Sequence, residues 1–300
     1  MTGVTGVDFS PVTFAIIGAP TSLGAFAPGQ EQAPRALRAA GVVERLDADD
    51  LGDLPVRRWR PDREHRRAQN AAGVLEAAVE VADRVETAVR SGRRAVVLGG
   101  DCTVELGVVS GVVRAGVEGF GLVYFDMHPD LNTPETVPTG TLDWMGPAHM
   151  LDLPGAHPDV AGIGPRRPLL APEQLAILGY QADQTKPAEH DAIERLGIQA
   201  ITREEVIADP EAAAARARSR FERYLVHFDV DVVDFVDLPL SENTGHNIGL
   251  PFATASAVLA ALAGDGLLAL TVTEHNPAHG AEDGSTSAAL ADALVAALGG

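Results

Sequence analysis

The chain has 300 residues, a formal net charge of -19 at pH 7 and a sequence pI near 4.7. This acidity repels nucleic-acid phosphates and anionic lipids, so it disfavours nucleic-acid and membrane partners and favours a small-molecule partner. A single cysteine excludes an internal disulfide framework, and the lack of a signal peptide or of an apolar run of about 18 residues predicts a cytoplasmic protein.

In chain order, the first predicted element is a buried strand over residues 13–20, an apolar run ended by turn residues. The glycine-rich segment 18–29 has neither a GxGxxG motif nor a Walker lysine, which favours an ordinary strand-to-helix connection over a phosphate site. Pro34 predicts the start of a short helix. The basic cluster from Arg57 to Arg67 is interleaved with acids and is interpreted as a solvated loop or a contact between subunits.

Two segments then predict a helix and a strand in succession. Apolar residues recur at helical spacing from 66 to 91, and residues 94–100 form a buried apolar run. Asp101, Cys102 and Thr103 follow at the turn into the next helix. Alternating strands and helices predict right-handed crossovers and a parallel sheet, within one domain over the whole chain.

Two apolar runs of strand length end in acids, and they are the most informative part of the sequence. The run from Gly121 ends in Asp126, His128 and Asp130, which would share one face if the chain stayed extended. The run from Tyr224 ends in Asp229, Asp231 and Asp234. Strand ends that lie side by side would gather several carboxylates and an imidazole in one crevice, which predicts a cation site at the carboxyl ends of the strands.

The rest of the chain is predicted to contain one functional loop and a further series of strands and helices. Residues 131–144 are rich in Pro, Thr and Gly and form an irregular stretch of the kind that carries function. The later elements are expected to be a weak strand at 158–164, helices at 171–179 and 189–196, a strand at 197–201, helices at 209–220 and 253–263, a strand at 267–274 and a helix at 285–298.

Four motifs together resemble the ureohydrolase family, which includes arginase, agmatinase and formimidoylglutamase. They are GGDC at 99–102, DMHPD at 126–130, FDVDVVD at 228–234 and EHNP at 274–277. The resemblance spans most of the chain. It implies an α/β fold of the arginase type, a three-layer α/β/α sandwich with a mostly parallel central sheet, two bound Mn²⁺ ions and a homo-oligomer, a trimer or a hexamer.

By this resemblance six residues would hold the two metals: Asp126 and Asp229 bridging both, His128 and Asp231 on one, and Cys102 and Asp130 on the other. Most of the family has histidine where this chain has Cys102, although some members that act on Nω-hydroxyarginine resemble it in having cysteine. A thiolate is softer than imidazole and suits zinc, cobalt or iron better than manganese. The alternative interpretation of Cys102 is a small buried thiol with no ligand role.

The loop after Asp130 resembles arginase in part. Asn132, Thr139, Gly140 and Thr141 correspond to positions that bind the amino-acid head group of the substrate. The catalytic histidine of that loop is replaced by Asp143, followed by Trp144 in place of the usual glycine. A substrate-binding aspartate of arginase would align near Arg167, and an arginine there would suit a carboxylate better.

The function implied by the resemblance is hydrolysis of a C–N bond in a guanidino or amidino compound, with urea as a candidate product. A metal-bridging hydroxide would attack the trigonal carbon, Asp130 would orient it, and Glu274 would bind the guanidinium. Asp143 is the first candidate for the acid that protonates the leaving amine. Two alternatives remain: a metal-dependent amidohydrolase acting on a non-guanidino substrate, and a catalytically silent binding or assembly protein with the same fold.

The other histidines are interpreted by position. His227 is expected to be structural, and three are expected at the surface, namely His65, His157 and His190. Four lie in or beside the matched segments: His149, His246, His275 and His279. Neighbouring strand residues point to opposite faces, so His275 should point away from the site if Glu274 points into it.

Overall fold

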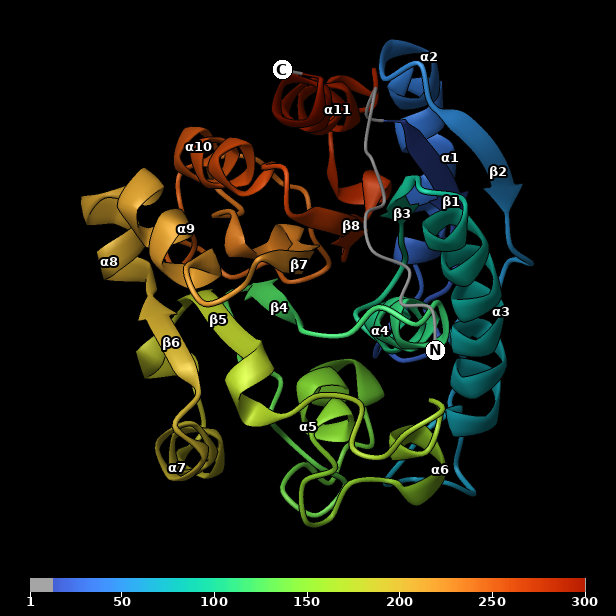
Figure 1. Ribbon diagram of the computed structural model, residues 1–300, viewed down its shortest axis with the longest axis vertical. Helices are drawn as coiled ribbons and strands as arrows, with labels where there is room; N and C mark the ends of the chain where they lie inside the picture. The colour runs from blue at the N-terminus through green and yellow to red at the C-terminus, as the bar shows by residue number, and fades with distance from the viewer. Residues whose placement is uncertain (1–12, 300) are drawn as a thin grey trace, which may run out of the picture.

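The computed structural model describes residues 13–299, and an eight-stranded sheet runs through the middle of it (Figure 1). The strand order is β2-β1-β3-β8-β7-β4-β5-β6, and every neighbouring pair is parallel. The strands are β1 (Phe14–Gly18), β2 (Asp49–Asp53), β3 (Arg94–Leu98), β4 (Phe120–Phe125), β5 (Leu175–Tyr180), β6 (Gln199–Thr202), β7 (Arg223–Asp229) and β8 (Leu267–Thr273).

Helices cover both faces of the sheet, which confirms the predicted three-layer α/β/α architecture (Figure 1). One layer contains α1 (Ala33–Ala39), α2 (Val42–Arg45), α8 (Arg203–Ala208), α9 (Pro210–Arg218), α10 (Phe252–Leu262) and α11 (Ser285–Leu298). The other contains α3 (Ala71–Arg90), α4 (Val104–Arg114), α5 (Gly146–Met150), α6 (Pro158–Ala161) and α7 (Pro187–Leu196). No helix within residues 13–299 is long and apolar enough to cross a membrane.

The central strands are largely apolar because both of their faces are buried. In β7, Leu225 packs in the core on the α3 and α4 side, whereas Tyr224 and Val226 pack in the core on the α10 and α11 side. This alternation follows from the two-residue period of a strand. The face on which a residue lies therefore also decides which layer of helices a functional side chain meets at the strand end.

Two predicted elements were wrong. Residues 158–164 were expected to be a strand, but Pro158 starts the short helix α6, where a proline in the first turn loses no hydrogen bond. Residues 171–179 were expected to be a helix, but a 3-10 turn at 172–174 leads into the fully parallel strand β5. A short apolar run fits a buried strand and a buried helix equally well, and only its neighbours decide between them.

Four elements had no counterpart in the sequence-based interpretation, namely α2, β2, α5 and α8. Strand β2 reads DDLGD, and it is an edge strand whose exposed acids hide the usual apolar signal. Helix α8 is a short segment whose N-terminus is stabilised by a capping box between Thr202 and Glu205. The other predicted strands and helices occur at or within a few residues of the expected bounds.

Helices α3 and α4 pack very closely, and this packing fixes the region after β3. A Cβ atom on Gly107 would lie 2.5 Å from the carbonyl oxygen of Ala78, and one on Gly111 would lie 2.7 Å from that of Ala82. Glycine at both positions lets the two helix backbones approach each other. The start of α4, with Cys102 just before it and Glu105 in its first turn, is thereby held against the ends of the central strands.

Candidate metal centre and active site

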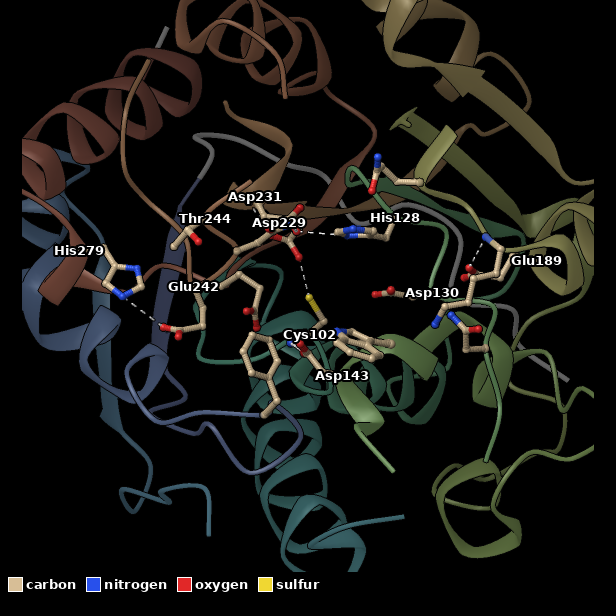
Figure 2. A pocket seen from close by; sticks show the side chains of 17 residues that line it. Cys102, His128, Asp130, Asp143, Glu189, Asp229, Asp231, Glu242, Thr244 and His279 are labelled. Atoms are coloured by element: carbon tan, nitrogen blue, oxygen red, sulfur yellow. Dashed lines mark hydrogen bonds and ion pairs between the residues drawn. The ribbon is translucent and has the colours of Figure 1, made fainter. Parts of the chain in front are cut away.

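A cavity of about 590 Å³ opens at the carboxyl ends of the central strands (Figure 2). The adjacent strands β3, β8, β7 and β4 each end there, as expected for a parallel sheet. Seven carboxylates line the cavity: Asp130, Asp143, Glu189, Asp229, Asp231, Glu242 and Glu274. Cys102 and His128 lie among them, so the cavity brings together the predicted strand-end motifs.

The first close group of side chains joins the ends of β4 and β7. The ligand atoms of Asp126, His128 and Asp231 lie within 4.8 Å of one another. The His128 Nδ1 atom is 3.2 Å from Asp231 Oδ2 and 3.5 Å from Asp126 Oδ1. Burial opposes a charge on the ring, but the two carboxylates raise the pKa of His128 well above its usual value. This group has the composition of a site for one divalent cation.

A second close group lies beside the first and shares Asp126 with it. Its members are Cys102, Asp126, His227 and Asp229, again with ligand atoms within 4.8 Å of one another. The thiol of Cys102 donates to Asp229 Oδ2 at 2.9 Å, as Figure 2 shows. Burial, followed by the charge of Asp229, raises the pKa of the Cys102 thiol well above its ordinary value. Without a cation this cysteine is therefore a thiol and not a thiolate.

The third close group reaches the loop after β4, because Cys102 also lies near Asp143 and Glu274. The backbone N–H of Cys102 donates to Asp143 Oδ1 at 2.6 Å. Asp143 is only 4% exposed, so it is a buried residue of the cavity wall and not a solvent-facing loop aspartate. Burial and the charge of Asp101 raise the pKa of Asp143 well above its usual range.

The carboxylates at the strand ends are poorly compensated by the protein alone. Burial and the charge of Asp231 raise the pKa of Asp126 to about 6, and burial raises that of Asp229 well above its usual range. Three of the buried oxygens without a hydrogen-bond partner among residues 13–299 belong to carboxylates at these strand ends, namely Asp126 Oδ2, Asp231 Oδ1 and Glu274 Oε1. Buried carboxylates without partners are costly unless cations neutralise them, so the residues present fit bound divalent metal ions.

The expected alternation after β4 does not continue to Asp130. The strand ends at Phe125, and Asp130 has a left-handed backbone with φ of +49°. Asp130 belongs to none of the three close groups but lines the same cavity, where its Oδ2 accepts a hydrogen bond from the Tyr124 hydroxyl at 2.6 Å. Its predicted role as a ligand therefore depends on a local turn and not on strand periodicity.

The predicted substrate-binding loop reaches the cavity through only some of its residues. Asn132 lines the cavity, whereas Thr139 and Thr141 do not. The Thr141 hydroxyl instead donates to that of Thr139 at 3.2 Å, and the Thr139 carbonyl accepts from Gln69 Nε2 at 2.7 Å. Contact between these threonines and a substrate stays a prediction.

The expectation for Arg167 needs correction. It does not line the cavity but forms a surface ion pair with Asp152 at 2.7 Å. The segment after β5 supplies the wall there instead, with Gln184, Lys186 and Glu189. The sequence did not predict these residues at the site, because the segment that forms β5 was predicted to be a helix. Had the strand been recognised, the rule that parallel strands place their sites at the carboxyl ends would have identified this segment.

The histidines divide between the site and the scaffold. Glu274 faces the cavity while His275 is buried away from it, bonded to the Leu240 carbonyl, as expected for neighbours on a strand end. His149 is also buried, with Nδ1 against the Met145 carbonyl. His279 lines the cavity. His227 was expected to be structural, yet it is fully buried within the second close group.

Comparison with known proteins gives a consistent result over the whole described fold. The sequence matches a family model described as "Arginase family" over residues 12–299. It is 33% identical over 239 residues to the arginase of Bacillus caldovelox, covering 75% of this chain and 78% of that protein. It is 30% identical over 284 residues to human arginase-1, covering 89% of this chain and 86% of that protein.

The fold also resembles the solved native structure of Bacillus caldovelox arginase at pH 5.6. The TM-score is 0.84 at 28% sequence identity, and the match covers 97% of this chain and 99% of that chain.

Proposed function

Since the chain belongs to the arginase family and is a hydrolase of guanidino compounds, we propose that it cleaves the C–N bond at a pair of divalent metal ions. The observation that carries this proposal is the overlap of the close groups at the strand ends. One group contains Asp126, His128 and Asp231, and a second shares Asp126 and adds Cys102 and Asp229. Shared carboxylates are what two neighbouring cations require.

The ligands divide between two positions. Asp126 belongs to both of these groups and Asp229 to the second alone. By the family resemblance both would contact both ions, and His128 and Asp231 would complete the site on one side. Cys102 and Asp130 would complete the site on the other side. Bound divalent ions would supply the chemistry of lowering the pKa of a coordinated water molecule, which makes a nucleophile available near neutral pH.

The protein's own groups would position the reactants. Glu274 is buried, and its Oε2 accepts a hydrogen bond from Gln30 at 3.1 Å while Oε1 has no partner among residues 13–299. Glu274 lines the cavity, and a carboxylate oxygen without a partner suits the N–H groups of a guanidinium. Asp130, held by the Tyr124 hydroxyl, would accept a hydrogen bond from the attacking water and orient it.

Asp143 is the group proposed to supply a proton to the leaving amine. Burial and the charge of Asp101 raise its pKa well above the usual range, which favours the protonated form that a general acid requires. One of its oxygens is fixed by the Cys102 N–H, which leaves the other free to carry and donate the proton. A carboxylic acid held neutral by burial is a suitable general acid.

The chemistry of the proposed ligands bears on which metal binds. A thiolate from Cys102 favours zinc, cobalt or iron over manganese, the usual metal of the family. We therefore propose two divalent ions, and we propose that the position at Cys102 is the one better suited to zinc, cobalt or iron than to manganese. A trimeric or hexameric assembly stays a prediction, which light scattering on the purified protein tests.

The test combines elemental analysis of the purified protein with a screen for urea or formamide release. The substrates are arginine, Nω-hydroxyarginine, agmatine, guanidinobutyrate and formimidoylglutamate. We expect about two metal ions per chain and turnover of at least one compound. Less than one tightly held ion per chain without turnover would favour the silent binding protein. Two ions without turnover of any of these compounds would favour an amidohydrolase with a non-guanidino substrate.

A further inference from the structure

The imidazole of His227 has the position and the support of a metal ligand. We propose that its Nε2 atom binds the ion at Cys102, where it would add a nitrogen to the sulfur of Cys102, the carboxylate of Asp130 and the two bridging carboxylates. The proposal rests on the proposed metal centre and specifies one of its two halves. The sequence motifs predict no metal-binding role for His227.

The geometry starts from strand β7. His227 precedes Asp229 by two residues, so both side chains lie on the same face of the strand. That face looks toward α4, where Glu105 is fully buried in the first turn. His227 is itself fully buried, and a ring nitrogen lies within 4.8 Å of the ligand atoms of Cys102, Asp126 and Asp229.

The two ring nitrogens face different partners. Nδ1 lies 3.4 Å from Glu105 Oε2, on the side of helix α4. Nε2 lies 3.3 Å from the Thr273 hydroxyl oxygen, and that oxygen is 3.4 Å from the Cys102 sulfur. Nε2 therefore faces the close group while Nδ1 faces the carboxylate. A carboxylate that accepts a hydrogen bond from the far nitrogen is the usual support of a metal-bound histidine.

The ring plane is also fixed. Tyr124 stacks on His227 with the ring centroids 4.1 Å apart and the planes within 2° of parallel. The same tyrosine donates its hydroxyl hydrogen bond to Asp130, the residue proposed to bind the same ion. Tyr124 thus contacts two of the proposed ligands, His227 with its ring face and Asp130 with its hydroxyl.

The substitution at Cys102 gives this arrangement a chemical reason. In the resembled family the position of Cys102 holds a histidine, so the change to cysteine removes a nitrogen donor. His227 would return a neutral nitrogen to the same ion from a different strand. A set of one thiolate, one imidazole and carboxylates is suited to zinc, cobalt or iron.

The experiment uses the full-length protein loaded with Co²⁺ and measures X-ray absorption at the cobalt edge. It uses the His128→Ala variant, because His128 is the other proposed imidazole ligand. We expect this variant to retain a cobalt–sulfur contact together with scattering from one imidazole. Scattering from sulfur with no imidazole would show that His227 only forms hydrogen bonds, and it would overturn the proposal.

Two further variants measure how tightly the ion is held. His227→Gln should weaken Co²⁺ binding at the Cys102 position by at least about 100-fold, and Glu105→Gln by about 10- to 100-fold, the usual effect of removing a supporting partner. Unchanged affinity in both variants would contradict the proposal. If the parent protein binds no metal at all, the proposed function fails together with this inference, whereas metal binding with sulfur but no His227 contribution fails the inference alone.

A separate observation concerns Lys186, the one lysine in the 300-residue chain, which lies at the cavity. Its Nζ atom is 5.2 Å from the centre of the Trp144 ring, and it forms no ion pair with residues 13–299. We infer that Lys186 binds a carboxylate of the substrate. The proposed substrates are therefore guanidino acids in preference to guanidino amines, which deepens the proposed function and rests on it.

The charges around the cavity support this assignment. Seven carboxylates line the wall, so a substrate with a carboxylate of its own meets repulsion unless a cation offsets it. Lys186 is exposed at the cavity beside Trp144, whereas Glu274 is buried. Arg167, the cation expected from the sequence, is paired with Asp152 away from the cavity.

The test compares each acid with the amine formed by removing its carboxylate, for example arginine with agmatine. Lys186→Met keeps the apolar stem against Trp144 and removes the charge, and Lys186→Arg keeps the charge. We expect Lys186→Met to weaken binding of the acid by about 10-fold or more, to leave the amine unchanged, and to be rescued by Lys186→Arg. Calorimetric affinities give the comparison without relying on turnover. An equal effect on acid and amine, or no effect on either, would overturn the inference.

Discussion

The thiol of Cys102, just after β3, donates a hydrogen bond of 2.9 Å to the carboxylate of Asp229 at the end of β7. Burial raises the pKa values of both groups well above their usual ranges, so the pair holds a proton where the proposed ion would lie. Metal binding has to displace that proton, and this makes Cys102 a spectroscopic reporter of the site.

We expect Co²⁺ added to the metal-free protein to produce a near-ultraviolet thiolate-to-metal charge-transfer band. The band should be absent in Cys102→Ser, which keeps the size of the residue but has no thiolate. Cys102→His should raise manganese affinity relative to zinc, because a harder nitrogen replaces a soft sulfur. Parallel absorption titrations of the three proteins provide the measurement. A parent protein that binds Co²⁺ without the band would remove Cys102 from the ligand set.

The bridging assignment predicts different losses for different aspartates. Asp126→Ala and Asp229→Ala should each remove both metal ions, because each carboxylate offsets two cations. Asp231→Ala should lose one ion and keep the other. Elemental analysis after gel filtration gives the number of ions per chain, with circular dichroism to confirm folding. Two retained ions in the Asp126 or Asp229 variant would show that the bridge lies elsewhere.

The proposed general acid predicts a kinetic effect without loss of metal. Asp143→Asn keeps an oxygen that accepts the Cys102 N–H but has no acidic proton. We expect kcat to fall by roughly 10²- to 10⁴-fold, with the metal content and KM close to those of the parent. Initial rates with the best substrate of the urea-release screen test this. If kcat is retained, a water molecule or another residue protonates the leaving amine.

Buried His149 predicts a pH dependence of stability that is unrelated to the metal. Burial lowers its pKa from 6.5 to about 4. Its Nδ1 atom is 2.6 Å from the Met145 carbonyl, and its Nε2 atom accepts from the His157 N–H, so only a neutral ring satisfies both contacts. As the pH falls below 6.5 the unfolded chain binds a proton that the folded protein refuses until about pH 4.

The stability contributed by neutral His149 is therefore present above pH 6.5 and is lost as the pH falls toward 4. The difference in free energy of unfolding between the parent and His149→Gln should shrink by about 2 kcal/mol from pH 8 to pH 5. Urea denaturation at several pH values measures it. The same shrinkage should occur with and without metal, because His149 is outside the close groups. A pH-independent difference would mean that the ring is not held neutral.

The sequence was most informative where a strand ended in acids. The apolar runs before Asp126 and Asp229 are long enough to identify as buried strands, and their pairing as neighbours follows once the sheet is parallel. The strand that became β5 was not identified, because its six residues also fit a buried helix. Because β5 was predicted as a helix, Lys186 in the segment after it was not predicted to line the site.

Contacts between distant segments were beyond prediction from the sequence. The burial of Asp143 depends on its position against the turn after β3, and a loop residue carries no pattern that reveals this. His227 could have been suspected, because it lies two residues before Asp229 on a strand that was recognised. Its partner Glu105 comes from helix α4, and no pattern in the sequence predicts the contact between these two residues.

The left-handed backbones of Asp130 and Glu274 have a consequence for any selection of more stable variants of the protein. Their φ angles are +49° and +64°, a region that costs a residue with a side chain about 1–2 kcal/mol and that glycine occupies freely. Replacing either acid with glycine would relieve this strain and remove a buried charge. Directed evolution for heat resistance alone should therefore discard these two acids early. The selected variants would be more stable than the parent protein but would lack its proposed catalytic activity.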